Sequence, residues 1–152
     1  MKRLIYFLLI ICCICSLEAC KAPSKIPNLK ELMVEIEQQV AMKNMMDLNA
    51  DELEEICYIE KLWVRQFAAK ISNTGINSDE IIFVEAIDEE AVKKIFEAIE
   101  KRYLEKRNQA AGYLPEELAL IEKAKKESKG KFVSFIVSAD VEKINKIYLS
   151  KF

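Results

Sequence analysis

The first nineteen residues carry a pattern that separates them from the part of the chain that folds. A basic start, Met1–Arg3, precedes an uncharged apolar run from Leu4 to Ser16, which is the n-region and h-region layout of a signal peptide. The run is shorter than the about 20 apolar residues that a membrane-spanning helix needs. The sequence therefore predicts a signal peptide over residues 1–19, and only the residues after it remain to build a fold.

The end of this segment, Leu17-Glu18-Ala19-Cys20, resembles the lipobox of bacterial lipoprotein signals, in which the cysteine is acylated and the chain is cut just before it. Leu17, Ala19 and Cys20 fit the motif, whereas Glu18 departs from the small or apolar residue that is usual there. We therefore expect a diacylglyceryl lipid on Cys20 that anchors the protein on the extracytoplasmic face of the cell membrane. An uncleaved signal anchor and ordinary cleavage after Ala19 are the alternatives.

Loss of the signal peptide limits what can hold the fold together. It removes Cys12, Cys13 and Cys15, and lipid occupies Cys20, so Cys57 has no disulfide partner within the chain. The remaining 133 residues (152 less 19) are enough for a hydrophobic core that needs no disulfide or metal. The expected division is residues 20–27 for the lipidated cysteine and a spacer, and residues 28–152 for a single domain.

Apolar residues recur at helical spacing in five segments and in strand-like runs in three. The predicted helices begin at four capping residues and one proline: Asn28, Asn49, Asp88, Pro115 and Asp140. The helix from Asp88 ends near Ala110, and the helix from Pro115 is expected to continue through a lysine-rich end to Gly130. The predicted strands are residues 62–72, 80–87 and 132–138. The order α-α-β-β-α-α-β-α predicts an α+β domain whose small, mainly antiparallel three-stranded sheet has the last strand at its centre.

Several short stretches, taken in their order and spacing, resemble a known family. Besides the acidic start of the long helix, they are Met45–Leu48, Asp51–Leu53, Ser78–Ile82, Tyr113–Glu116 and Gly130–Val133. The chain resembles domain of unknown function 4358, a family of small bacterial lipoproteins, although that family often has Tyr-Gly where this chain has Cys57-Tyr58. The resemblance implies a lipid-anchored extracytoplasmic domain with no assigned activity and no catalytic residues to carry over.

Composition excludes several chemistries. The chain has 0 histidines, which rules out Ser-His and Cys-His nucleophile systems and histidine-ligated zinc. The 23 basic and 25 acidic residues nearly balance, so no nucleic acid partner is expected. Cys57 lacks a histidine base and lies between Ile56 and Tyr58, which predicts a half-buried structural thiol. Ser128–Lys131 matches the Ser-x-x-Lys of penicillin-binding proteins, but that motif opens a helix and this one is expected to end one.

Two groups of acidic and amide side chains are candidates for a calcium site or a catalytic site. Asn73, Asn77, Asp79 and Glu80 crowd one predicted loop and could hold Ca²⁺, but their spacing does not match the EF-hand rule. Asp88–Glu90 is better explained as the start of a helix, where acids favour the helix dipole, than as a paired-carboxylate glycosidase site. Neither group predicts a metal or a cofactor.

Two aromatic residues form the candidate binding surface. Trp63 and Phe67 lie four residues apart, on one face of the first predicted strand. Core packing is the usual role of such residues, and an exposed platform for a peptide or glycan is the alternative. A methionine cluster is likewise expected to fill the core rather than to bind a partner: Met33, Met42, Met45 and Met46.

The sequence therefore favours a binding or accessory module of the cell envelope over an enzyme, and it predicts no catalytic residue. The expected partners are the membrane, through lipid on Cys20, and an envelope protein. Two alternatives stay open: a carboxylate-dependent cell-wall hydrolase and a solute-capturing lipoprotein of a transporter. The chain is short for the usual two-lobed capture fold, which counts against the second alternative.

Overall fold

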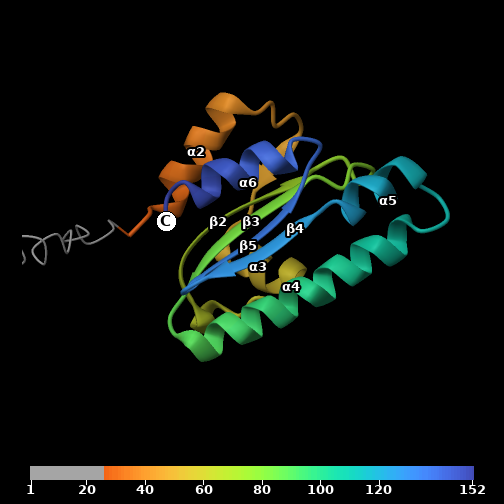
Figure 1. The fold of residues 1–152 in the computed structure, drawn as a ribbon. Coiled ribbons are helices and arrows are strands. Elements are labelled where there is room, and N and C mark those ends of the chain that lie inside the picture. Colours follow the sequence, from red (N-terminus) through yellow and green to blue (C-terminus); the bar gives the residue numbers. More distant parts are fainter. Residues whose placement is uncertain (1–25) are drawn as a thin grey trace, which may run out of the picture.

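The computed structural model describes residues 26–152, so the predicted signal peptide, Cys20 and most of the spacer lie outside the described residues. In the described part, five α-helices and one short 3-10 helix, η1, surround a single sheet (Figure 1). The bounds are α2 Leu29–Gln39, α3 Ala50–Cys57, η1 Lys61–Trp63, α4 Glu89–Ala110, α5 Pro115–Glu122 and α6 Val141–Leu149.

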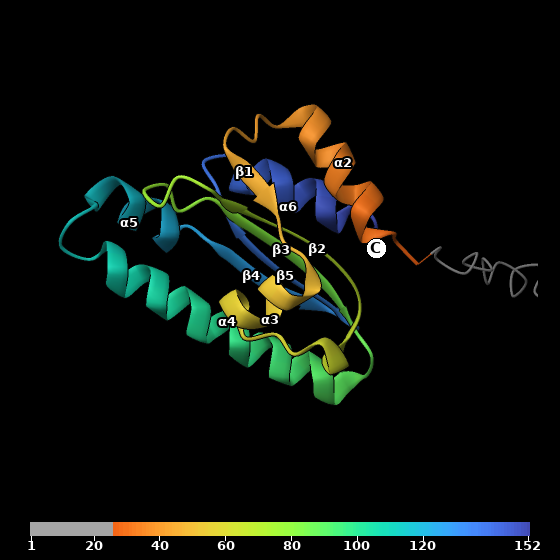
Figure 2. The same ribbon diagram turned by 180° about the vertical axis from the view of Figure 1, so that it is seen from behind.

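The sheet has five antiparallel strands in the order β1-β2-β3-β5-β4. Its middle strand is β3, which is buried along its whole length, and not the last strand as the sequence predicted. α2 and α6 cover one face of the sheet, and α3 and α4 lie on the other, so the molecule has three layers (Figures 1 and 2). The strand bounds are β1 Met45–Asp47, β2 Val64–Ser72, β3 Glu80–Ala86, β4 Lys125–Lys129 and β5 Phe132–Val137.

Alternate residues of the middle strand contribute to two separate cores. Ile82 and Val84 face the cluster that includes Ile95 and Ile99 of α4. Ile81 and Phe83 face the cluster under α2 and α6, where the rings of Phe83 and Tyr148 stack with their centroids 4.8 Å apart. Each such side chain contributes about 1.5–3 kcal/mol when it is fully buried, so both faces hold helices firmly.

The prediction of an α+β fold with five helices is confirmed, but the three-stranded sheet is wrong, and β4 is one of the two missed strands. α5 ends at Glu122, and the lysine-rich segment assigned to its end pairs with β5 instead. Gly130 makes the turn of this hairpin at a φ of 57°, a conformation that favours glycine. Segment 125–129 alternates no apolar residues of its own, so only its bonds to β5 make it a strand.

The other missed strand is β1, which the sequence placed at the end of the first helix. α2 stops at Gln39, and Met45–Asp47 pairs with Lys70–Ser72 of β2. The expected filling of the core by methionine is right for Met33, whereas Met46 stands 39% exposed on the edge strand. A three-residue strand is defined by its partner more than by its own sequence, which is why the pattern did not reveal it.

The helix starts agree with the predicted caps. Asn28 and Asn49 accept backbone hydrogen bonds at the starts of α2 and α3, and Asp88 does so for α4. Asp140 occupies the corresponding position before α6 without capping it through its side chain. The first predicted strand was wrong at its start, because residues 61–63 form η1 and β2 begins at Val64.

Candidate functional site

Two adjoining hollows of about 440 and 900 Å³ lie on the surface of the described residues. They share Lys30 of α2, Ala50 of α3 and Phe67 of β2, so we treat them as one feature, the edge groove. α2 and α3 lie on opposite faces of the sheet, so a hollow that touches both can only lie at a sheet edge. β1 and β2 lie at one edge of the sheet (Figure 2). The strand residues in the groove lining belong to these two strands, so the groove lies at the β2 edge.

The backbone of β2 is only partly covered at this edge. β1 pairs with Lys70–Ser72, and Leu48 N–H then donates to the Ala69 carbonyl at 2.9 Å before the chain turns away into α3. Because backbone groups point to alternate sides along a strand, the N–H and C=O of Phe67 face the same way as those of Ala69. No described residue forms a hydrogen bond with these Phe67 groups. Within residues 26–152, the Phe67 N–H and C=O therefore lie without a backbone partner on the side of β2 that faces the edge groove.

The two outer edges of the sheet are treated differently. β4 presents Lys125, Lys126 and Lys129 along five residues, and charged side chains of this kind discourage another strand from adding. The β2 edge has no such row of lysines around Phe67, and its walls include Leu53, Met33 and Val34. Of these, Val34 is 52% exposed. On β2 itself the charged residues are Arg65 and Lys70, at either end of the uncharged stretch that contains Phe67, so this edge carries fewer charges than β4.

Hydrogen bonds to the side chain of Gln66 hold α2, the first wall of the groove, in place. Gln66 of β2 accepts from Leu29 N–H at 3.0 Å and donates to the Pro27 carbonyl at 3.0 Å. Its amide also donates to the buried Glu85 carboxylate at 2.6 Å. Gln66 therefore fixes both the start of α2 and the point at which the preceding chain enters the domain.

The second wall, α3, begins with a complete capping box. Asn49 Oδ1 accepts from the Asp51 and Glu52 N–H groups at 2.9 and 3.0 Å, and Glu52 accepts from Asn49 N–H at 2.8 Å. Lys61 of η1 forms an ion pair with Asp51. These contacts fix the start of α3, which lines the edge groove just after the chain leaves β1.

Charge is distributed unevenly along the edge groove. The smaller hollow, beside the start of β2, is lined by Lys30, Lys61 and Arg65 and by no acidic residue. The larger hollow adds a net negative set beside β1, made up of Glu37, Asp47, Glu52 and Lys70. Burial lowers the pKa of Lys70, but the hydrogen bonds that its ammonium donates to the Glu37 and Asp47 carboxylates outweigh burial and raise its pKa above the ordinary value. The groove therefore has a basic end and an acidic end.

The predicted aromatic pair is only partly at this site. Phe67 lies on β2 and lines both hollows, although its ring is partly buried against the core. Trp63 belongs to η1, is half-buried against the same core, and lines neither hollow. The structure therefore joins Phe67 to the edge groove and assigns Trp63 to packing.

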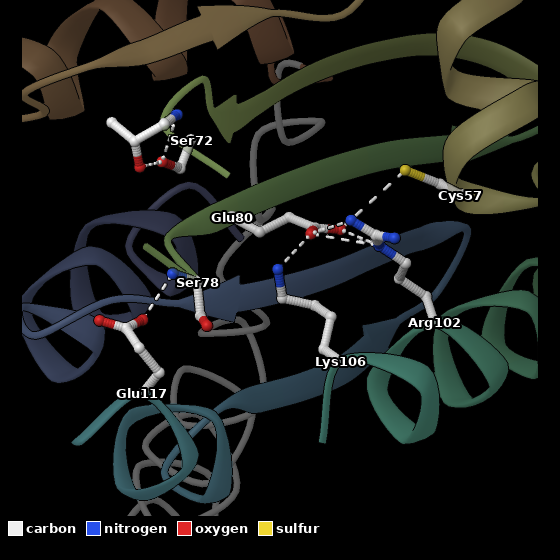
Figure 3. Close-up of polar contacts among 8 residues, drawn as sticks. Cys57, Ser72, Ser78, Glu80, Arg102, Lys106 and Glu117 are labelled. Atoms are coloured by element: carbon white, nitrogen blue, oxygen red, sulfur yellow. Dashed lines mark hydrogen bonds and ion pairs between the residues drawn. The ribbon is translucent and has the colours of Figure 1, made fainter. Parts of the chain in front are cut away.

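A second polar arrangement surrounds Glu80 at the start of β3, and Figure 3 shows Arg102 and Lys106 reaching it from α4. Glu80 is fully buried; Arg102 donates to its two oxygens at 2.9–3.2 Å, and Lys106 approaches at 2.9 Å. Burial lowers the pKa of Arg102, while the hydrogen bond and charge of Glu80 raise it more strongly. This cluster, which we call the Glu80 lock, fixes α4 against the sheet.

Cys57 at the end of α3 belongs to the same surroundings. Its thiol is fully buried, rather than half-buried as predicted, and lies 4.0 Å from Glu80 Oε1. Burial, followed by the charge of Glu80, raises the pKa of Cys57 to about 12, although Arg102 and Lys106 oppose the shift. The thiol therefore stays protonated at neutral pH, so its role is structural.

A polar hollow of about 330 Å³ lies beside the Glu80 lock, under the loop between β2 and β3. Asp79 lines it, and burial together with the nearby Glu117 raises the pKa of Asp79. Glu117 of α5 accepts from Ser78 N–H at 2.6 Å and so ties down the loop (Figure 3). Of the residues of the candidate calcium loop, Glu80 turns inward to Arg102 and Lys106, so its carboxylate does not face the loop.

The other candidate motifs of the sequence lie in a hairpin turn and at the start of a helix. Ser128–Lys131 crosses from β4 into the hairpin turn, not the start of a helix. Asp88 caps α4 by accepting from Ala91 N–H at 2.8 Å, and Glu89 and Glu90 occupy the first turn. The Glu80 lock was missed, although a glutamate at the head of an apolar strand and two cations four residues apart on a helix were a usable signal.

Membrane attachment concerns residues outside the described range, since Cys20 precedes residue 26. Among the helices of residues 26–152, none combines the length and the apolar character needed to cross a membrane. The predicted anchor on Cys20 therefore stays a prediction.

Comparison with known proteins gives one match. The family model described as "Domain of unknown function (DUF4358)" matches residues 38–138, from the end of α2 to just beyond β5. No curated protein and no solved structure matches the chain. The match spans more than half of the 152 residues and agrees with the resemblance noted from the sequence. The chain therefore belongs to the DUF4358 family, a domain family of unknown function.

Proposed function

We propose that this chain is a binding module of the cell envelope, anchored through lipid on Cys20, which holds an extended segment of a partner protein in the edge groove. The observation that carries this proposal is the backbone of Phe67, which no strand of the described residues covers, on the sheet edge between α2 and α3. Peptides that add to a sheet edge gain affinity from main-chain hydrogen bonds and specificity from pockets for alternate side chains. The edge groove offers both.

The position of the edge groove supports an envelope partner. The chain enters the domain at Pro27, which is bonded to Gln66 beside the smaller hollow. A lipid on Cys20 would be joined to this point by only a short spacer. The basic end of the groove would then lie within reach of segments that emerge near the membrane surface.

Photo-crosslinking in living cells tests the proposal. A crosslinking amino acid at Val34, on the groove wall, should give an adduct whose cross-linked peptide maps to one extended segment of one envelope protein. The same probe at Leu104, which is 50% exposed on α4, is the matched control and should not give this adduct. An adduct to a second copy of this chain, or the same adducts from both positions, would contradict the proposed partner.

One observation favours the carboxylate-dependent hydrolase as a second candidate. Asp79 lies beside Glu117 at a polar hollow and has a raised pKa, and a carboxyl group whose pKa is raised in this way suits acid–base chemistry. Turnover of purified peptidoglycan that is lost in both Asp79→Asn and Glu117→Gln would favour the hydrolase. Glu117 already accepts a backbone hydrogen bond from Ser78, so we rank this function second.

A further inference from the structure

Resting on the proposed function, we infer that the segment held in the edge groove runs antiparallel to β2. We also infer that it carries a basic residue toward its N-terminal end and an acidic residue toward its C-terminal end. Two independent features of the groove lead to this: the hydrogen-bonding frame left open by β1, and the order of charges along the walls.

The open frame sets the direction. β1 runs antiparallel to β2, and its last bond joins Leu48 N–H to the Ala69 carbonyl. The chain then leaves at Asn49, so the place that a longer β1 would occupy beside Phe67 is free. In an antiparallel pair one residue can accept from Phe67 N–H and donate to its carbonyl, which satisfies both groups at once. A parallel strand would have to divide these two bonds between residues on either side.

The walls set the order of charges. Arg65 and Lys70, which mark the two ends, are five residues apart, so about 17 Å separates them along an extended strand. Lys30, Lys61 and Arg65 line the smaller hollow. Lys61 pairs with Asp51 and Glu54, and Arg65 pairs with Glu85, so Lys30 carries the positive charge that no ion pair within residues 26–152 offsets. The larger hollow adds three acidic residues and one lysine, which sum to −2. β1 and Leu48 already cover Lys70–Ser72 and Ala69, so an antiparallel segment paired with Phe67 starts on the side of the acidic wall. It ends beside Arg65, where its C-terminal end meets the basic wall.

Two peptides of identical composition separate this order from simple groove binding. The probes are Lys-Thr-Val-Thr-Val-Thr-Glu and the charge-exchanged Glu-Thr-Val-Thr-Val-Thr-Lys, both acetylated and amidated so that only side chains differ in charge. Binding to the full chain in detergent micelles is followed by fluorescence anisotropy. The basic-first peptide should bind about tenfold more tightly, as two partly exposed charge pairs allow.

Charge reversal on the wall provides the control. Lys30→Glu should lower the preference for the basic-first peptide at least severalfold, because Lys30 lines both hollows and Glu also suits the first turn of α2. Lys93→Glu, on the exposed side of α4, should leave the preference unchanged.

The outcomes separate this inference from the proposed function. Equal affinities, or tighter binding of the acidic-first peptide, overturn the inferred order while binding in the groove stands. Failure of both peptides to bind, when the Val34 crosslink still maps to an extended segment, overturns the inferred charge pattern alone. Failure of both peptides together with absence of that crosslink overturns the inference and the proposed function.

Discussion

At the scale of single residues, Glu80 is the most demanding position in the molecule. Its carboxylate is fully buried, and the side chains of Arg102 and Lys106 are themselves only 17% and 11% exposed. Taking three charges out of water costs several kcal/mol per ion, and only their mutual contacts offset that cost. The Glu80 lock therefore tolerates loss of one partner poorly.

Glu80→Gln should lower the free energy of unfolding by about 3 kcal/mol, because it leaves two buried cations without a counter-charge. Glu90→Gln is the matched control, since Glu90 pairs with Lys94 on the surface and should change stability by less than about 1 kcal/mol. Urea denaturation of the two variants gives the comparison. Equal losses would show that the Glu80 lock is not a stabilising contact.

Cys57 makes stability depend on pH in a defined direction. Burial raises the pKa of its thiol from 9.0 to about 12, so the folded state holds this proton more tightly than the unfolded state. The resulting stability is present below pH 9 and is lost as the pH rises from about 9 toward 12. The stability difference between the parent chain and Cys57→Ala should therefore change by about 2–3 kcal/mol, to the disadvantage of the parent chain, between pH 8 and pH 11 in denaturant titrations. A difference that does not change with pH would contradict this assignment.

At the scale of elements, the sequence predicted structures that are encoded locally. The capping box of Asn49 and Glu52 and the apolar stripe of α4 are visible in a few consecutive residues. β4 is not, because Lys125–Lys129 is a strand only through its pairing with β5. A charged segment after a helix fits the end of that helix as well as it fits an edge strand. The sequence alone therefore favoured a continued helix over residues 125–129.

The candidate site was predictable only in part for a related reason. Phe67 was singled out as an aromatic residue on a strand, and it does lie in the edge groove. The groove forms, however, because β1 ends at Asp47. No sequence pattern near Phe67 indicates where β1 ends. The walls of the groove come from segments 30–37 and 48–53, which approach β2 only in the folded chain.

β5 should carry a large share of the core. Ile136 is fully buried in the cluster under α2 and α6, so Ile136→Ala should cost about 2–5 kcal/mol of unfolding free energy. Ile76→Ala, at a loop position that is 64% exposed, should cost less than about 0.5 kcal/mol. Thermal and urea unfolding of the fragment that begins at Lys21, without added metal, measures both. A similar cost at the two positions would contradict the assigned core.

At the scale of the whole molecule, the family match covers the sheet and the helices on one of its faces, but not most of the layer on the other face. The match to residues 38–138 includes all five strands but ends before α6 and leaves out most of α2. These two helices cover the same face of the sheet. α2 is also the wall that supplies Lys30, Met33 and Val34 to the edge groove. The α2 wall of the groove thus lies outside the matched domain, whereas β2, α3 and most of the charged lining lie inside it.

The proposed anchor predicts where the protein is found. Cys20→Ala should move the protein from the membrane fraction to the medium or to an uncleaved precursor, because the acylated thiol is gone. Mass spectrometry of the native protein should show a lipid-modified N-terminal cysteine. An unmodified N-terminus in the native protein would remove the anchor from the account.

Two substitutions at Phe67 test the central claim most directly. Its N–H faces the edge groove and not β3, so Phe67→Pro removes the free donor without removing a bond to β3, and an edge strand can accept proline there. Phe67→Ala loses the same ring but keeps the donor, and circular dichroism checks that both variants fold. The yield of the Val34 crosslink to its partner is then compared. Strand addition predicts a yield at least tenfold lower in Phe67→Pro than in Phe67→Ala, whereas equal yields would contradict binding through the open edge of β2.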